Sequence, residues 1–208
     1  MTTSDPTVLR FHVLGDSLAA GVGCTRAEET LGHRLARALR AAGHGVDLRV
    51  LAVSGARSAD LAAQVRTSLS AGVDLALVVI GANDLTSFVP SAVGAGLVHD
   101  AVAALRRADA RVVVATAPDL GVVSHVPPAY RGLVSSISGQ YAGAQGDAVR
   151  RAGGVVAPVG AQLSARFAAD RSLFSADRFH PSPAGYAVIA SALEPTVTAA
   201  AEHRLPAR

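Results

Sequence analysis

The chain has 208 residues, half of them apolar, which is enough to bury the core of one domain, and nothing in its composition requires a second. Its formal net charge is only +3 although its pI is about 9.7, because all 19 basic residues are arginines, which stay charged far above neutral pH. The arginines are scattered, with no run longer than a pair, so the charge pattern argues against a nucleic-acid partner.

Several kinds of functional site are excluded by residues that the chain lacks. Without lysine it has no phosphate-binding P-loop lysine and no Schiff base. It has no HExxH motif and a single cysteine, Cys24, so we expect neither an internal disulfide, nor a zinc site, nor a cofactor. Cys24 itself is expected to be a small buried hydrophobic residue.

The sequence also bears on location. Its start, "MTTSDPTVLRF", has neither the basic residues nor the apolar core of a secretory signal, so we predict a cytoplasmic protein. The longest apolar stretch, "LALVVIGA" at 75–82, falls far short of the roughly 20 residues that span a bilayer, so no transmembrane segment is expected. A lone cysteine fits a reducing compartment.

Short runs rich in β-branched residues alternate with helical patterns along the whole chain. Strands are predicted at 7–15, 46–53, 73–81, 110–117 and 153–159. Apolar residues at helical spacing predict helices at 31–42, 61–69, 98–105 and 134–148, and Ser182-Pro183 predicts the start of a last helix. The closing "AEHRLPAR" is expected to be a frayed tail. This alternation predicts a single α/β domain whose parallel sheet is covered by helices on both faces.

In such a sheet, ligands bind beyond the carboxyl ends of the strands, so the residues there are the candidates for a site. The segments that follow the first four predicted strands are all polar or glycine-containing: Gly15-Asp16-Ser17-Leu18, Ser54-Gly55-Ala56-Arg57, Gly81-Ala82-Asn83-Asp84 and Pro118-Asp119-Leu120-Gly121. Late in the chain, "SADRFHPSP" places Asp177 and His180 three residues apart, just before the last predicted helix.

With these blocks the sequence resembles the SGNH hydrolases, also called the GDSL family. The family's Ser of a GDS motif, Gly, Asn of GxND and His of DxxH have counterparts here, in the family's order, at Ser17, Gly55, Asn83 and His180. In the second block only Gly55 matches, since an asparagine often found beside it in the family is absent. The resemblance covers nearly the whole chain, 1–208, and implies a flavodoxin-like three-layer α/β/α sandwich with a five-stranded parallel sheet.

The same residues make chemical sense as a serine hydrolase. Cleaving an ester through a serine needs a nucleophile, a base, a group that orients the base, and donors for the oxyanion. Ser17 is the predicted nucleophile, His180 the base and Asp177 the carboxylate that holds the imidazole. The oxyanion would be bound by the backbone N–H groups of Ser17 and Gly55 and by the side-chain amide of Asn83.

Each of these residues also has a structural interpretation. Ser17 could be a helix N-cap, Asn83 an Asx turn, Gly55 a residue needed for backbone geometry alone, and Asp177 with His180 a surface ion pair. Asp16 and Asp84 are expected to brace the loops through hydrogen bonds to the backbone. Among the other histidines, only His125, in the loop after the fourth strand, is a rival base.

The sequence is less informative about the substrate. The segments 84–96 and 118–132 border the predicted site and are rich in valine and proline, so they could form an acyl pocket or simply pack over the sheet. An ester of a small molecule is the predicted substrate. A thioesterase, a carbohydrate deacetylase or an acyltransferase could use the same site, and a non-catalytic flavodoxin-like module that binds flavin or a nucleotide is the alternative of another class.

Overall fold

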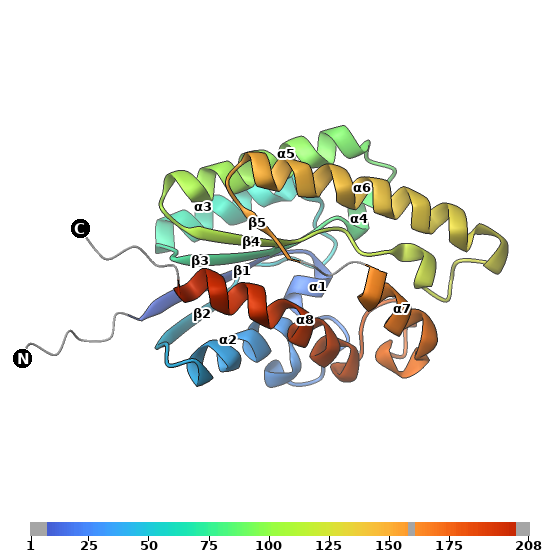
Figure 1. The fold of residues 1–208 in the computed structure, drawn as a ribbon, viewed down its shortest axis with the longest axis horizontal. Helices are drawn as coiled ribbons and strands as arrows, with labels where there is room; N and C mark the ends of the chain where they lie inside the picture. The colour runs from blue at the N-terminus through green and yellow to red at the C-terminus, as the bar shows by residue number, and fades with distance from the viewer. Residues whose placement is uncertain (1–7, 158–160, 203–208) are drawn as a thin grey trace, which may run out of the picture.

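The computed structural model describes residues 8–157 and 161–202, and within them five parallel strands form one sheet in the order β2-β1-β3-β4-β5 (Figure 1). The strands are β1 Leu9–Gly15, β2 Val46–Val50, β3 Leu75–Val79, β4 Arg111–Ala115 and β5 Val155–Val156. All five predicted strands are present, each shorter than its apolar run, and residues 158–159 of the last predicted run lie outside the described residues. The predicted fold class is confirmed.

Helices cover both faces of this sheet. Their bounds are α1 Ser17–Ala20, α2 Leu31–Ala41, α3 Leu61–Ala71, α4 Ala82–Thr86, α5 Ser91–Arg107, α6 Arg131–Arg151, α7 Ala161–Ala169 and α8 Pro183–Glu202. Helices α2 and α8 lie against one face, whereas α3, α5 and α6 lie against the other (Figure 1). The result is a three-layer α/β/α arrangement.

The alternation of side chains along the strands divides the core into two halves. In β3, Leu75 and Leu77 pack with the half that includes α2 and α8, whereas Ala76 and Val78 pack with the half that includes α3 and α5. All residues of β3 are buried, as expected for the central strand of a sheet that is covered on both faces.

The last helix begins where the sequence predicts and ends later. Pro183 is its first residue, and the Ser182 hydroxyl accepts a hydrogen bond from the N–H of Gly185. The predicted frayed tail is wrong for Ala201 and Glu202, because α8 continues to Glu202 and buries Ala201 in the core that α8 shares with α2. The remainder of that predicted tail, 203–208, lies outside the described residues.

Two other features differ from the sequence pattern. Helix α7 was not predicted, and in α6 the apolar spacing is misleading, because Ile137 is half exposed while the polar residues Ser138 and Gln145 are buried. Gln145 is buried because its side chain accepts a hydrogen bond from Ala117 N–H and donates one to Ile80 O. In the part of the chain that the structure describes, no helix is both long and apolar enough to cross a membrane.

Hydrogen bonds between strand exits bring three loops together at the carboxyl edge of the sheet. The N–H of Asp16, just after β1, donates to Val79 O at the end of β3, and the N–H of Val53, after β2, donates to Gly15 O. The segments that follow β1, β2 and β3 are therefore neighbours. These are the segments that carry Ser17, Gly55 and Asn83.

Candidate active site

Ser17 stands at a sharp turn between β1 and α1. Gly15, the last residue of β1, has a φ of +135°, and a Cβ at this position would collide with Val79 O, so only glycine fits. Asp16 is the N-cap of α1, and its Oδ1 atom accepts a hydrogen bond from Leu18 N–H at 2.9 Å. Ser17 is thus the first residue of the helix and not its cap, which leaves its hydroxyl available for another partner.

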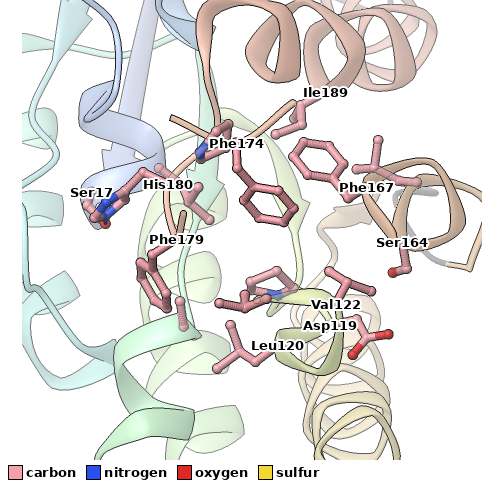
Figure 2. Close-up of a pocket in the computed structure, with 16 residues that line it drawn as sticks. Ser17, Asp119, Leu120, Val122, Ser164, Phe167, Phe174, Phe179, His180 and Ile189 are labelled. Atoms are coloured by element: carbon pink, nitrogen blue, oxygen red, sulfur yellow. Dashed lines mark hydrogen bonds between the residues drawn. The ribbon is translucent and has the colours of Figure 1, made fainter. Parts of the chain in front are cut away.

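That partner is His180, which comes from the other end of the chain. The Nε2 atom of His180 lies 2.9 Å from Ser17 Oγ (Figure 2). Its Nδ1 atom lies 2.6 Å from Asp177 Oδ2. An ionised carboxylate only accepts hydrogen bonds, so Nδ1 carries the proton of the neutral ring and donates a hydrogen bond to Asp177. In the neutral ring, Nε2 is then an acceptor for the Ser17 hydroxyl, as a general base must be.

The turn that carries Asp177 is built to keep its side chain ionised. Asp177 Oδ1 accepts hydrogen bonds from the Ser175 hydroxyl at 2.7 Å and from the backbone N–H groups of Phe179 and His180, each at 2.9 Å. Burial acts to raise the pKa of Asp177, but the hydrogen bonds from His180, Ser175 and the backbone outweigh it and hold that pKa well below its ordinary value. Asp177 therefore remains an acceptor for His180 over the whole neutral range of pH.

Two of the three predicted oxyanion donors, Gly55 and Asn83, lie in the segments that follow β2 and β3. Gly55 has a φ of +84°, and a Cβ placed on it would meet no atom within 4 Å, so the space beside it is open. Asn83, in α4, donates one amide hydrogen from Nδ2 to Ala56 O at 3.0 Å. Because an amide NH₂ group has two hydrogens, this bond fixes the side chain and leaves a second hydrogen for another acceptor.

Two buried aspartates hold these loops, as the sequence predicts for Asp16 and Asp84. The carboxylate of Asp84 accepts hydrogen bonds from the backbone N–H and the hydroxyl of Ser58, just beyond the turn that contains Gly55. Asp16 is fully buried and its Oδ2 atom has no hydrogen-bond partner among the described residues. Burial raises the pKa of Asp16 to about 6, the charge of Asp84 adds to the rise, and the hydrogen bond from Leu18 opposes it.

The remaining histidines and Cys24 have other surroundings. His125, the predicted rival of His180, is exposed, and His203 lies outside the described residues. His12 is buried within β1, with Nδ1 2.8 Å from Ser68 Oγ, and Cys24 is half-buried against the core, less buried than expected. No cluster of residues in the described ranges could hold a metal ion.

An apolar pocket opens beside Ser17 and His180 (Figure 2). Of the two segments for which the sequence leaves open an acyl pocket or simple packing, the one after β4 lines it, through residues that include Leu120, Val122 and Val123. The other, 84–96, does not line it; it comprises the end of α4, the connection to α5 and the start of α5.

The opposite wall of the pocket comes from a region that the sequence reading missed. It consists mainly of apolar residues of α7, of the turn before α8, and of α8: Leu163, Phe167, Phe174, Phe179, Pro181 and Ile189. A signal was present, because three of the five phenylalanines of the chain, at 167, 174 and 179, lie within the thirteen residues before His180.

Comparisons with known proteins agree with this geometry. The model of the GDSL-like Lipase/Acylhydrolase family matches residues 13–188. The GDSL-like esterase Rv1075c of Mycobacterium tuberculosis (strain ATCC 25618 / H37Rv) is 40% identical over 192 residues, which are 90% of this chain and 61% of that protein. This chain thus spans about three fifths of the length of that relative.

Solved structures share the fold at low sequence identity. TesA superposes with a TM-score of 0.73 at 19% identity, covering 92% of this chain and 99% of that one. Axe2, an acetylxylan esterase from Geobacillus stearothermophilus, superposes with a TM-score of 0.68 at 16% identity, covering 91% and 94% of the two chains. Because the family model matches most of the chain, and the GDS, GxND and DxxH blocks meet at one edge of the sheet, this chain belongs to the GDSL-like lipase/acylhydrolase family.

Proposed function

We propose that the chain is a serine hydrolase that cleaves carboxylic esters of small molecules through an acyl-enzyme. The observation that carries the proposal is the continuous hydrogen-bonded series Asp177–His180–Ser17 at the mouth of an apolar pocket. Family membership and the name of the esterase relative support it. The match over 13–188 also supports a single hydrolase domain, which we take to comprise residues 1–208.

In this proposal, Ser17 Oγ attacks the ester carbonyl carbon while its proton passes to His180 Nε2. Asp177 stabilises the imidazolium that forms. The tetrahedral intermediate then collapses, its C–O bond to the alcohol breaks, and His180 returns the proton to the leaving oxygen. Water attacks the acyl-enzyme with His180 again as the base, which releases the acid and restores Ser17.

The charge that develops on the carbonyl oxygen needs donors already in place. We assign this role to the N–H groups of Ser17 and Gly55 and to the free hydrogen of the Asn83 amide. The bond from Asn83 to Ala56 O and the bonds from Ser58 to the Asp84 carboxylate support this assignment, because they tie the loop of Gly55 to α4. The donors would then be fixed before substrate arrives.

The pocket favours esters of apolar acyl groups over acetylated sugars. A sugar bearing an acetyl group needs polar partners around the site, whereas the pocket beside Ser17 is lined mainly by aliphatic and aromatic side chains. Thioesters and acyl transfer to an alcohol use the same acyl-enzyme and stay second candidates. We also propose a cytoplasmic location, which the single cysteine fits and which cell fractionation would test.

The experiment that tests the function is hydrolysis of 4-nitrophenyl butanoate and butanoyl thiocholine by the wild-type protein. We expect saturable hydrolysis of the oxygen ester, with the thioester cleaved more slowly. Wild-type protein with an intact circular-dichroism spectrum that cleaves neither, but binds flavin or a nucleotide in a calorimetric titration, would establish the binding module instead.

A further inference from the structure

Phe174 lines two cavities. One is the apolar pocket that begins at Ser17 and His180, with a volume of about 90 Å³. The other has a volume of about 560 Å³ and is lined by Ser124, Arg171, Phe174, Ser175, Ala176 and Arg178. Phe174 is the one residue that the two linings share, so it lies between the pocket beside Ser17 and a cavity lined by two arginines.

The ring of Phe174 is held in a fixed place relative to the catalytic residues. It packs edge-to-face against Phe167, with ring centroids 5.1 Å apart and an interplanar angle of 80°. Its backbone pairs with Pro181, and the next N–H, that of Ser175, donates to His180 O at 2.8 Å. The segment that presents His180 to Ser17 therefore also positions Phe174 across the pocket, where Figure 2 shows its ring between Phe179 and Phe167.

The volume of the first pocket limits what it can hold. An apolar protein cavity of about 150 Å³ accommodates benzene, which has six carbons. By the same proportion, 90 Å³ accommodates about four carbons. An acyl group attached to Ser17 would thus fill the pocket with about four carbons beyond its carbonyl.

From this geometry we propose that the enzyme selects short acyl groups, and that Phe174 sets the upper limit of chain length by closing the apolar pocket against the cavity of Arg171 and Arg178. The inference rests on the proposed ester hydrolysis. Each methylene that enters the pocket before it is full should raise kcat/KM by about fourfold, the equivalent of about 0.8 kcal/mol. For an acyl chain too long for the pocket, kcat/KM should fall about tenfold or more, because the surplus methylenes meet the ring of Phe174.

The test is a series of 4-nitrophenyl esters from acetyl to dodecanoyl, assayed with wild type, Phe174→Ala and Phe167→Ala. Wild type should be fastest with butanoyl to hexanoyl esters and at least about tenfold slower with decanoyl. In Phe174→Ala the two cavities join, so decanoyl and dodecanoyl esters should be cleaved about as fast as hexanoyl. Phe167 lines only the first pocket, so Phe167→Ala should extend the limit by a few carbons and still discriminate against dodecanoyl.

The outcomes separate this inference from the proposed function. A wild-type profile that is flat to dodecanoyl, or a Phe174→Ala profile equal to that of wild type or of Phe167→Ala, would overturn the role of Phe174 while leaving ester hydrolysis intact. Absence of hydrolysis of every ester by folded wild-type protein would overturn both. Should Phe174→Ala fail to fold, Phe174→Leu keeps an apolar side chain at this place. Its ratio of kcat/KM for the octanoyl ester to kcat/KM for the butanoyl ester should exceed that of wild type.

Discussion

His180 and Ser17 are separated by 163 positions in the sequence, yet the His180 Nε2 atom lies 2.9 Å from Ser17 Oγ. The contact joins the exit of strand β1 to the turn that precedes α8. Both partners are held by neighbours, since the backbone N–H of Asp16 bonds to β3 and Asp177 binds the other nitrogen of the imidazole. The arrangement is therefore preorganised for proton transfer between Ser17 and His180.

Replacing Asp177 by Asn should cost on the order of 10³ to 10⁴ in kcat. The amide of Asn can present its NH₂ to His180, which then carries its proton on Nε2 and can no longer accept from Ser17. The measurement is kcat for 4-nitrophenyl butanoate in both proteins. Ser175→Ala is the matched control, because it removes one hydrogen bond to Asp177 and leaves the carboxylate, and it should lower kcat by less than about tenfold. Equal losses in the two variants would contradict the role of Asp177.

Asn83→Ala separates an oxyanion donor from a residue that merely holds a loop. If its free amide hydrogen stabilises the tetrahedral intermediate, kcat should fall by about 10² to 10³ with KM nearly unchanged, because the charge develops only in the transition state. The lost bond to Ala56 O should in addition lower the free energy of unfolding by about 1 kcal/mol. Steady-state kinetics and a urea titration measure the two effects. Reduced stability with normal kcat would leave Asn83 only its structural role.

Asp16→Asn should stabilise the protein at neutral pH and have less effect in acid. The pKa of Asp16 is raised to about 6 in the folded protein, against about 4 for an unfolded chain, so the folded state binds the proton more tightly. The contribution of Asp16 to the stability of the wild type therefore falls as the pH rises from 4 to 6, and above pH 6 its buried charge costs on the order of 3 kcal/mol. Asn removes this charge and can still accept from Leu18 N–H.

Thermal melting of both proteins at pH 4.5 and pH 8 measures this effect. The Tm of Asp16→Asn should exceed that of wild type by more at pH 8 than at pH 4.5. Asp109→Asn is the control, since its side chain is exposed and its replacement should shift Tm equally at the two pH values. An increase in Tm for Asp16→Asn that is equal at the two pH values would show that ionisation of Asp16 does not destabilise the native state.

The sequence was a good guide wherever a local pattern repeats or a motif stands at the end of a strand. The five apolar runs become the sheet, and the segments with Ser17, Gly55 and Asn83 become neighbours because parallel strands share one carboxyl edge. The Asp177–His180 pair could be recognised because three residues separate its members, a spacing that lets a single turn join the two side chains.

Features that depend on tertiary contacts could not be read in the same way. The tail predicted at Ala201 is helix, because its burial is decided by packing against α2, a segment far away in the sequence. Segment 84–96 was a candidate pocket wall, but it connects α4 to α5 and does not line the pocket. The actual wall contains Phe167 and Phe174, which come near Ser17 only because the turn before α8 folds over the sheet. The hydrogen bond from Asn83 to Ala56 O cannot be predicted from any sequence periodicity.

The central claim is that Ser17 is the nucleophile, and covalent labelling with a fluorophosphonate tests it most directly. Wild-type protein should gain one phosphonyl group, which mass spectrometry of the peptides should place on Ser17, and ester hydrolysis should be lost in proportion to labelling. Ser17→Ala should keep the melting temperature of a folded protein, take no label and hydrolyse 4-nitrophenyl butanoate no faster than the uncatalysed reaction. Labelling of Ser17→Ala at the wild-type rate, or hydrolysis by that variant above a few per cent of wild type, would contradict the account.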